Sequence, residues 1–207
     1  GAVFLSAFTT KCAVYALARG FPGTELLIYV GAVMVVFPVF FAAFENDLRR
    51  VLAYLLNNQL GFMVCAVGIG SSLAIDGVVA HAYAHILYKS LLFMAMGAVL
   101  YRAGTVQASQ LGGLYKSMPL TTIFCIVGAA SMSTPLFVGF VGKSLTLSAV
   151  AYEHHLYIWL ILMFGSAAVF LLSGVRVVYS AFFARGSGVQ CREAPAGMLV
   201  AMGLTSI

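Results

Sequence analysis

Residues 81–101 read HAYAHILYKSLLFMAMGAVLY, and this stretch decides the fold class of the chain. After Lys89 it contains no charged residue through Tyr101, and the residues from Gly77 onward are also mostly apolar. A transmembrane helix needs about 20 mostly apolar residues. We therefore expect a membrane-spanning helix over residues 77–101, with two histidines and a lysine inside it.

The composition of the whole chain supports this expectation. Of its 207 residues, 62% are hydrophobic and only 8% are charged. Soluble domains are about 45–50% apolar and about 25% charged, so these few charges cannot cover a water-exposed surface. With 5 prolines, 4 cysteines and no charged tail, a disordered chain and a disulfide scaffold are excluded as well. We expect an all-α polytopic transmembrane helical bundle.

Polar clusters divide the chain into spans. We expect helices over residues 1–18, 25–44 with a kink at Pro38, 51–71, 77–101, 119–152, 155–183 and from about 194, with loops over 102–118 and 185–193. The 34 residues of 119–152 would extend about 51 Å as one helix, more than the hydrocarbon core, and SMSTP interrupts them at 131–135. Two shorter elements are favoured there, giving seven or eight helical elements with at least one broken helix. The positive-inside rule favours a single crossing of this block, whereas its length and Pro135 favour two crossings, so the orientation of the chain in the membrane stays open.

The most informative charges lie inside these spans. His81, His85 and Lys89 are spaced i, i+4, i+8, which places them on one helical face. Histidine titrates near neutrality and a desolvated lysine can lose its charge, so this row could pass protons through waters. Structural hydrogen bonding is the first alternative. A zinc site is the second, although no Glu, Asp or Cys completes a ligand set.

Two further lysines lie within apolar stretches. Lys11 lies about 12 Å along the helix from Arg19, which is deep for a side chain that must reach the interface. Lys143 follows the break at Pro135, where freed backbone groups commonly build an ion site. A packing or snorkelling lysine is the alternative at the first position, and a lysine reaching the interface is the alternative at the second.

The remaining polar features have simpler interpretations. The third span is unusually polar near its start because of Asn57, Asn58 and Gln59. The charged cluster of residues 45–50 is best explained as a solvated loop, and Arg176 as a residue that snorkels or meets a partner subunit. The cysteines show no C-x-x-C pair and are expected to be packing residues. We expect no cofactor in this chain and no nucleic-acid partner.

Five segments together carry a resemblance to a known family. They are AFTTKCAVYALARGFPG, NDLRRVLAY followed by NNQLGF, AHAYAHILYKSLLFMAMGAVLY, QLGGLYKSMP and STPLFVGFVGKSLTL, within about residues 7–150. The chain resembles the C-terminal half of the proton-conducting antiporter-like membrane subunits shared by respiratory complex I, Mrp-type cation/proton antiporters and membrane-bound hydrogenases. The wording of the first segment is most similar to the D-type subunits of Mrp antiporters.

The resemblance implies roles for individual residues. Lys11 corresponds to the lysine of a broken helix in the first half-channel, and Lys143 to the terminal residue of the second. His85 matches the histidine of the central relay, while His81 and Lys89 match further relay positions. Asp47 and Arg49 would be supporting charges; arginine at Arg49 replaces the family's usual lysine and hardly releases a proton.

The resemblance also implies a larger protein. The family fold has about fourteen helices with two inverted repeats. Residues 1–50 would end the first half-channel, 51–184 would form the second repeat, and 194–207 would start the final helix, all in a single membrane domain that is a piece of a longer chain.

The expected function follows from these assignments. The chain would help to translocate protons, alone or coupled to sodium or potassium, beside other membrane subunits in the lipid bilayer of a bacterial inner membrane. The rival hypothesis is a structural subunit that does not pump, and a weaker third is a transporter for an organic solute. The helical face that carries His81 and Lys89 discriminates between the first two hypotheses. If the chain relays protons, this face should lie inside the bundle beside polar cavities. If the chain is a scaffold, the face should pack against Leu and Phe without water.

Overall fold

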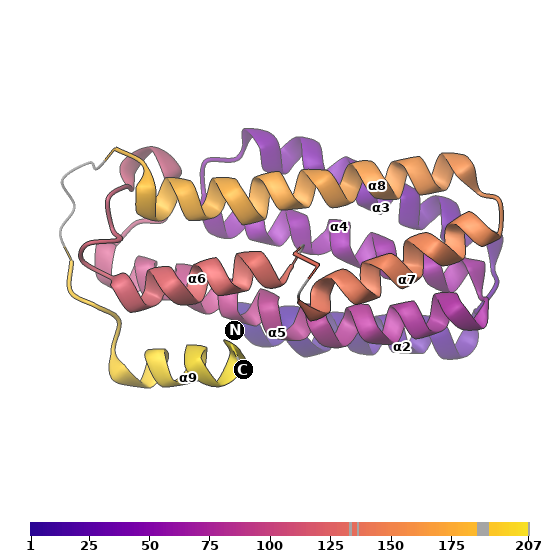
Figure 1. Cartoon of the computed structure of the whole chain (residues 1–207), viewed down its shortest axis with the longest axis horizontal. Coiled ribbons are helices and arrows are strands. Elements are labelled where there is room, and N and C mark those ends of the chain that lie inside the picture. The colour runs from indigo at the N-terminus through magenta and orange to yellow at the C-terminus, as the bar shows by residue number, and fades with distance from the viewer. Residues whose placement is uncertain (133, 136, 186–190, 207) are drawn as a thin grey trace.

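The structure, a computed structural model, describes residues 1–132, 134–135, 137–185 and 191–206. Within them the chain forms helices joined by short connections, elongated along one direction (Figure 1). The helical segments are α1 (Ala2–Phe4) continued by the π-helical η1 (Leu5–Thr9) and α2 (Thr10–Gly20), α3 (Glu25–Phe44), α4 (Leu48–Ile69), α5 (Ser72–Ala103), α6 (Pro119–Ser131), α7 (Val138–Tyr152), α8 (Leu156–Val169) continued by the π-helical η3 (Phe170–Arg176) and η4 (Tyr179–Phe183), and α9 (Ala196–Ser206). These eight segments confirm the all-α bundle and the expected seven or eight helical elements. The short 3-10 turn η2 (Ala108–Gln110) lies between α5 and α6.

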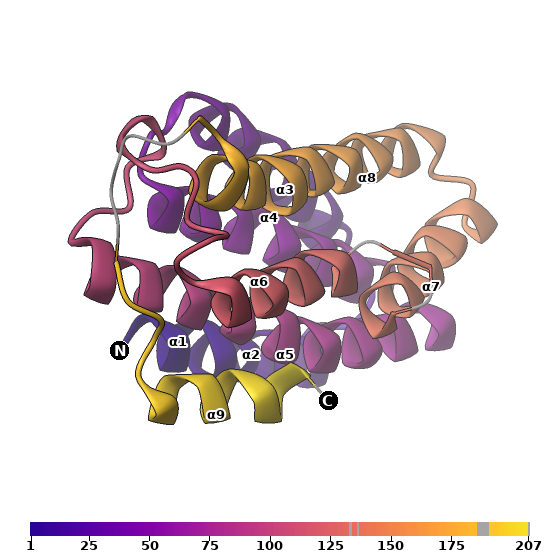
Figure 2. The same cartoon turned by 60° about the vertical axis from the view of Figure 1, so that its left-hand side comes forward.

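Helix α5 lies at the centre of the bundle. It packs against α4, α6, α7 and α9, and also against α1 and η1 at the start of the chain. On the opposite side of α4, helices α3 and α8 pack against each other and against α4. Figure 2 shows α9 alongside α5 and α6. A residue on the inward face of α5 is therefore surrounded by protein on several sides.

The break between α6 and α7 is present as expected. Helix α6 ends at Ser131 and α7 begins at Val138, so the apolar block is two short helices that follow one another end to end (Figure 1). Gly139 lies against the carbonyl of Ser131, where an added Cβ would collide with the oxygen. The glycine therefore allows the second helix to start close beside the end of the first.

Two helices begin earlier than the sequence indicated. Helix α4 starts at Leu48 rather than Val51, because the Asp47 carboxylate accepts hydrogen bonds from the backbone N–H groups of Arg49 and Arg50, at 2.8 and 3.1 Å. Such a side chain satisfies the free N–H groups of the first turn. Part of the charged cluster is thus a helix start, which corrects its interpretation as a solvated loop.

Helix α5 is also longer than expected. It covers 32 residues, or about 48 Å at ~1.5 Å per residue, instead of residues 77–101. In the part of the chain that the structure describes, four helical segments are long and apolar enough to cross a membrane by length and composition: Glu25–Phe44, Leu48–Ile69, Ser72–Ala103 and Leu156–Phe183. At the C-terminal end, α9 begins at Ala196 rather than 194, and residues 186–190 of the loop expected over 185–193 lie outside the described residues.

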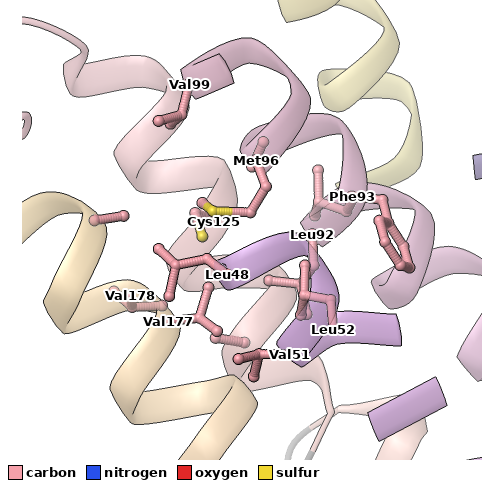
Figure 3. Close-up of a cluster of buried hydrophobic side chains, with 14 of the residues drawn as sticks. Leu48, Val51, Leu52, Leu92, Phe93, Met96, Val99, Cys125, Val177 and Val178 are labelled. Carbon is pink, nitrogen blue, oxygen red and sulfur yellow. The ribbon is translucent and has the colours of Figure 1, made fainter. Parts of the chain in front are cut away.

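The loop expected over residues 102–118 packs against the helices. Its apolar side chains Val106, Leu111, Leu114 and Met118 are buried. They join a large core cluster in which Leu48, Leu52, Leu92, Met96 and Cys125 meet Val177 and Val178 (Figure 3). An isolated antiparallel bridge between Asp47 and Gln107 ties this loop to the start of α4.

Arg176 has a different role from the one expected. Its Nη1 donates to the carbonyl oxygens of Ala42 and Ala43, both at 2.9 Å, and its Nη2 donates to that of Glu45 at 2.7 Å. The last carbonyls of a helix have no partner within the helix. Arg176 therefore caps the C-terminal end of α3, whereas the sequence suggested that it reaches the membrane interface or contacts a partner subunit.

Candidate functional site

The nitrogen-bearing row of α5 faces the interior of the bundle. His81, His85 and Lys89 are all 0% exposed. The spacing of four residues keeps them on one side of α5, as the sequence indicated, and that side faces neighbouring helices. Because burying polar groups without partners is costly, the contacts of these three residues decide what the row can do.

Lys11 reaches this row from the first helical segment. Its ammonium nitrogen Nζ lies 2.7 Å from Nδ1 of His85. It also donates to the carbonyl oxygen of Ser6 at 2.7 Å and to Oγ1 of Thr10 at 3.2 Å. The π-helical turn Leu5–Thr9 ends two residues before Lys11, and π-helical turns in α-helices occur frequently at functional sites.

His81 is held from the other side by α4. Its Nε2 lies 3.1 Å from Oε1 of Gln59, which also accepts a hydrogen bond from the hydroxyl of Tyr88 at 3.2 Å. The Gln59 amide donates to Oδ1 of Asn58 at 2.8 Å. The Asn58 amide in turn donates to the carbonyl oxygen of Val35, in α3, at 2.6 Å.

The sequence shows these amides of α4 but does not by itself indicate what they contact. Since α4 begins at Leu48, Asn58 and Gln59 lie in the middle of the helix and not near its start, and both are 0% exposed. Two adjacent amide side chains in the middle of a membrane-spanning helix were the signal that could have identified them.

Lys143 lies on α7, which packs closely against α5. A Cβ added to Gly142 would lie only 2.5 Å from the backbone nitrogen of His81, so the two helices touch at this level. Lys143 is 3% exposed and lines a cavity of about 310 Å³ together with Ser144 and Ser166. The second expected lysine is therefore buried next to the α5 row, beside a cavity whose lining is mostly apolar and includes two serines.

Several buried nitrogens of this region have no hydrogen-bond partner among the described residues. They are Nδ1 of His81, Nε2 of His85, and the Nζ atoms of Lys89 and Lys143. Buried polar atoms in proteins are nearly always paired with protein or with ordered water. Each of these four nitrogens therefore has hydrogen-bonding capacity that the described side chains do not use.

The other candidates contribute differently. Asp47 serves as the helix cap of α4, and the half-buried Arg49 lines a groove of about 480 Å³ with Ser6 and Thr10 near Lys11. Within the described residues, no group of three or more His, Cys, Asp or Glu side chains could hold a metal ion. The structure thus joins His85 to Lys11 directly, brings Lys143 beside α5, and leaves Asp47 in a capping role.

The fold and site together define a polytopic helical membrane protein with a buried row of lysines and histidines. The family described as NADH:quinone oxidoreductase/Mrp antiporter, TM matches residues 1–171, and the chain belongs to this family. This confirms the resemblance seen in the sequence, while the finer similarity to the D-type subunits of Mrp antiporters stays a prediction.

Individual relatives show the same relationship. The chain is 35% identical over 159 residues to the A/B subunit of a probable K(+)/H(+) antiporter of Rhizobium meliloti, covering 73% of this chain and 16% of the relative. It is 35% identical over 164 residues to the L subunit of the NADH-quinone oxidoreductase of Pseudomonas aeruginosa, covering 76% and 26%. A chain in the structure of the Mrp complex from Dietzia sp. matches with a TM-score of 0.81 and 26% identity, covering 89% and 36%. The chain thus spans about a third or less of the length of these relatives.

Proposed function

We propose that this chain is the proton-conducting part of a membrane subunit in a multisubunit cation/proton antiporter or an NADH-quinone oxidoreductase-type pump. Protons would move between Lys11, His81, His85, Lys89 and Lys143, with Asp47 and Arg49 as supporting charges. Coupled sodium or potassium movement, other membrane subunits as partners and a bacterial inner membrane belong to the same proposal. So does the division into the end of a first half-channel (1–50), a second repeat (51–184) and the start of a final helix (194–207).

The contact between Lys11 and His85 carries the proposal. A charged Lys11 can give a proton from Nζ to the lone pair on Nδ1 of His85, 2.7 Å away. Lys11 then becomes a neutral amine and His85 an imidazolium. The imidazolium can release its other proton from Nε2, which has no hydrogen-bond partner among the described residues. One histidine can thus receive a proton on one side and release it on the other.

The contacts of the α5 row favour a proton relay rather than a scaffold that packs only apolar side chains. His81 and His85 contact Gln59 and Lys11 rather than apolar side chains alone. Lys143 lines a cavity in which two serines stand among apolar side chains. A membrane scaffold has no need of buried lysines, which are costly to place in a bilayer.

The direct test is proton flux through the intact subunit, assembled with its complex in proteoliposomes and monitored with a pH-sensitive dye. Lys143→Ala and His85→Ala should each reduce proton flux by about tenfold or more, since each removes a group that takes and gives a proton. Assembly of the complex, measured by native electrophoresis, should persist. Lys116→Ala is the matched control, because Lys116 is exposed and packs on the ring of Tyr115. Normal flux in an assembled Lys143→Ala complex would contradict the proposal and favour the scaffold hypothesis.

A further inference from the structure

We infer that Gln59 is a positioning residue that holds His81 as the tautomer protonated on Nε2, so that His81 exchanges protons only through Nδ1. The directions of the hydrogen bonds between α3, α4 and α5 fix this tautomer. What the tautomer does for proton movement rests on the proposed function, but the tautomer itself does not.

The direction of the hydrogen bonds is set at the carbonyl oxygen of Val35. A carbonyl oxygen can only accept, so the Asn58 group that lies 2.6 Å from it must be the NH₂ group. The other end of the Asn58 amide, Oδ1, is then an acceptor. It lies 2.8 Å from the Gln59 amide, which must present its own NH₂ group there.

The Gln59 oxygen consequently faces α5. It is 3.1 Å from Nε2 of His81 and 3.2 Å from the hydroxyl of Tyr88. Because this oxygen can only accept, Nε2 of His81 must carry a hydrogen. A neutral imidazole has one N–H group, so Nδ1 of His81 holds the lone pair.

The chain of amides is enclosed, which makes its direction hard to reverse. Asn58 and Gln59 are 0% exposed. Gly165 of α8 covers the link to Val35: a Cβ there would lie 3.1 Å from Nδ2 of Asn58 and would collide with Cγ1 of Val35. Water therefore has little room to replace either partner, and turning one amide would place two donors or two acceptors against each other.

The two histidines consequently differ in function. Nδ1 of His85 faces Lys11 and its Nε2 is free of protein partners among the described residues, so a proton can enter at one nitrogen and leave at the other. Nε2 of His81 faces an amide oxygen, which is too weak a base to take a proton near neutral pH. A proton that His81 accepts on Nδ1 must leave from Nδ1. His81 can therefore hold a proton and return it but cannot pass it onward. Protons that cross the site move through His85.

The test is ¹⁵N solid-state NMR of histidine-labelled intact subunit in lipid nanodiscs, with the His81 signals assigned by comparison with a His81→Gln variant. The unaltered protein should show neutral His81 only with hydrogen on Nε2. Asn58→Leu frees the Gln59 amide to turn, and Gln59→Met removes the acceptor, so both variants should add a signal from the form with hydrogen on Nδ1. Tyr88→Phe is the control. It removes only the second donor to the same oxygen and should leave the tautomer unchanged.

A His81 that carries its hydrogen on Nδ1 in the unaltered protein would overturn the inference. So would unchanged His81 spectra in both Asn58→Leu and Gln59→Met, provided that the spectra of His85 show the fold intact. Proton flux measured on the same variants, assembled with their complex in proteoliposomes, separates the two claims. An absence of flux with the expected tautomer would contradict the proposed function and leave the role of Gln59 standing.

Discussion

The ammonium nitrogen of Lys11 lies 2.7 Å from Nδ1 of His85, although 74 residues separate them in the chain. The contact forms because the first helical segment packs against α5 at η1 and α1. The contact joins Lys11 of the first helical segment to the row of His81, His85 and Lys89 on α5. In the proposed relay, proton transfer at His85 therefore depends on a side chain from another helix.

The first prediction concerns this contact. Lys11→Met keeps a long, flexible side chain but removes the proton donor of His85, so proton flux through the reconstituted complex should fall by about tenfold or more. Lys11→Arg keeps the charge, but arginine does not give up its proton in proteins, so flux should fall as far. Full flux in the Lys11→Arg variant would mean that charge alone is needed at this position.

A second prediction concerns the stability that Arg176 contributes by capping α3. Arg176→Met leaves the carbonyls of Ala42, Ala43 and Glu45 without their donors. Hydrogen bonds to charged groups contribute about 1.5–3 kcal/mol in favourable settings, and a half-buried arginine should lie at the lower end of that range. Thermal unfolding of the purified subunit in detergent measures the loss. Arg19→Met, at an exposed arginine, is the control and should leave the unfolding temperature unchanged.

A third prediction uses two glycines as a matched pair. Gly165→Ala places a methyl group against Val35 and Asn58, so it should destabilise the subunit by about 1–3 kcal/mol, the usual cost of overpacking. Gly97→Ala on α5 meets nothing within 4 Å and should be neutral or stabilising, by up to about 1 kcal/mol, because alanine favours helix. Thermal unfolding of the two variants side by side measures the difference. Equal effects would mean that α8 does not seal the Asn58 to Val35 link.

The sequence was informative wherever the signal lay within one element. The spacing of His81, His85 and Lys89 placed them on one face, and the length of the block around Pro135 required a break. The periodicity of the sequence does not show which helix faces pack against each other. The partner of His85 lies 74 residues away, and Arg176 caps a helix end more than 130 residues before it. Both depend on how the helices pack together, which a single sequence does not specify.

The last prediction distinguishes the two roles given to Asp47. As the cap of α4, its carboxylate accepts from the N–H groups of Arg49 and Arg50, and asparagine can accept the same bonds. Asp47→Asn should therefore keep the unfolding temperature, whereas Asp47→Ala should cost about 0.5–2 kcal/mol. If the negative charge also supports proton movement, Asp47→Asn will lower proton flux in the reconstituted complex without loss of stability. If Asp47 acts only as a cap, the asparagine variant will conduct protons as well as the unaltered protein, and Asp47 will leave the set of supporting charges.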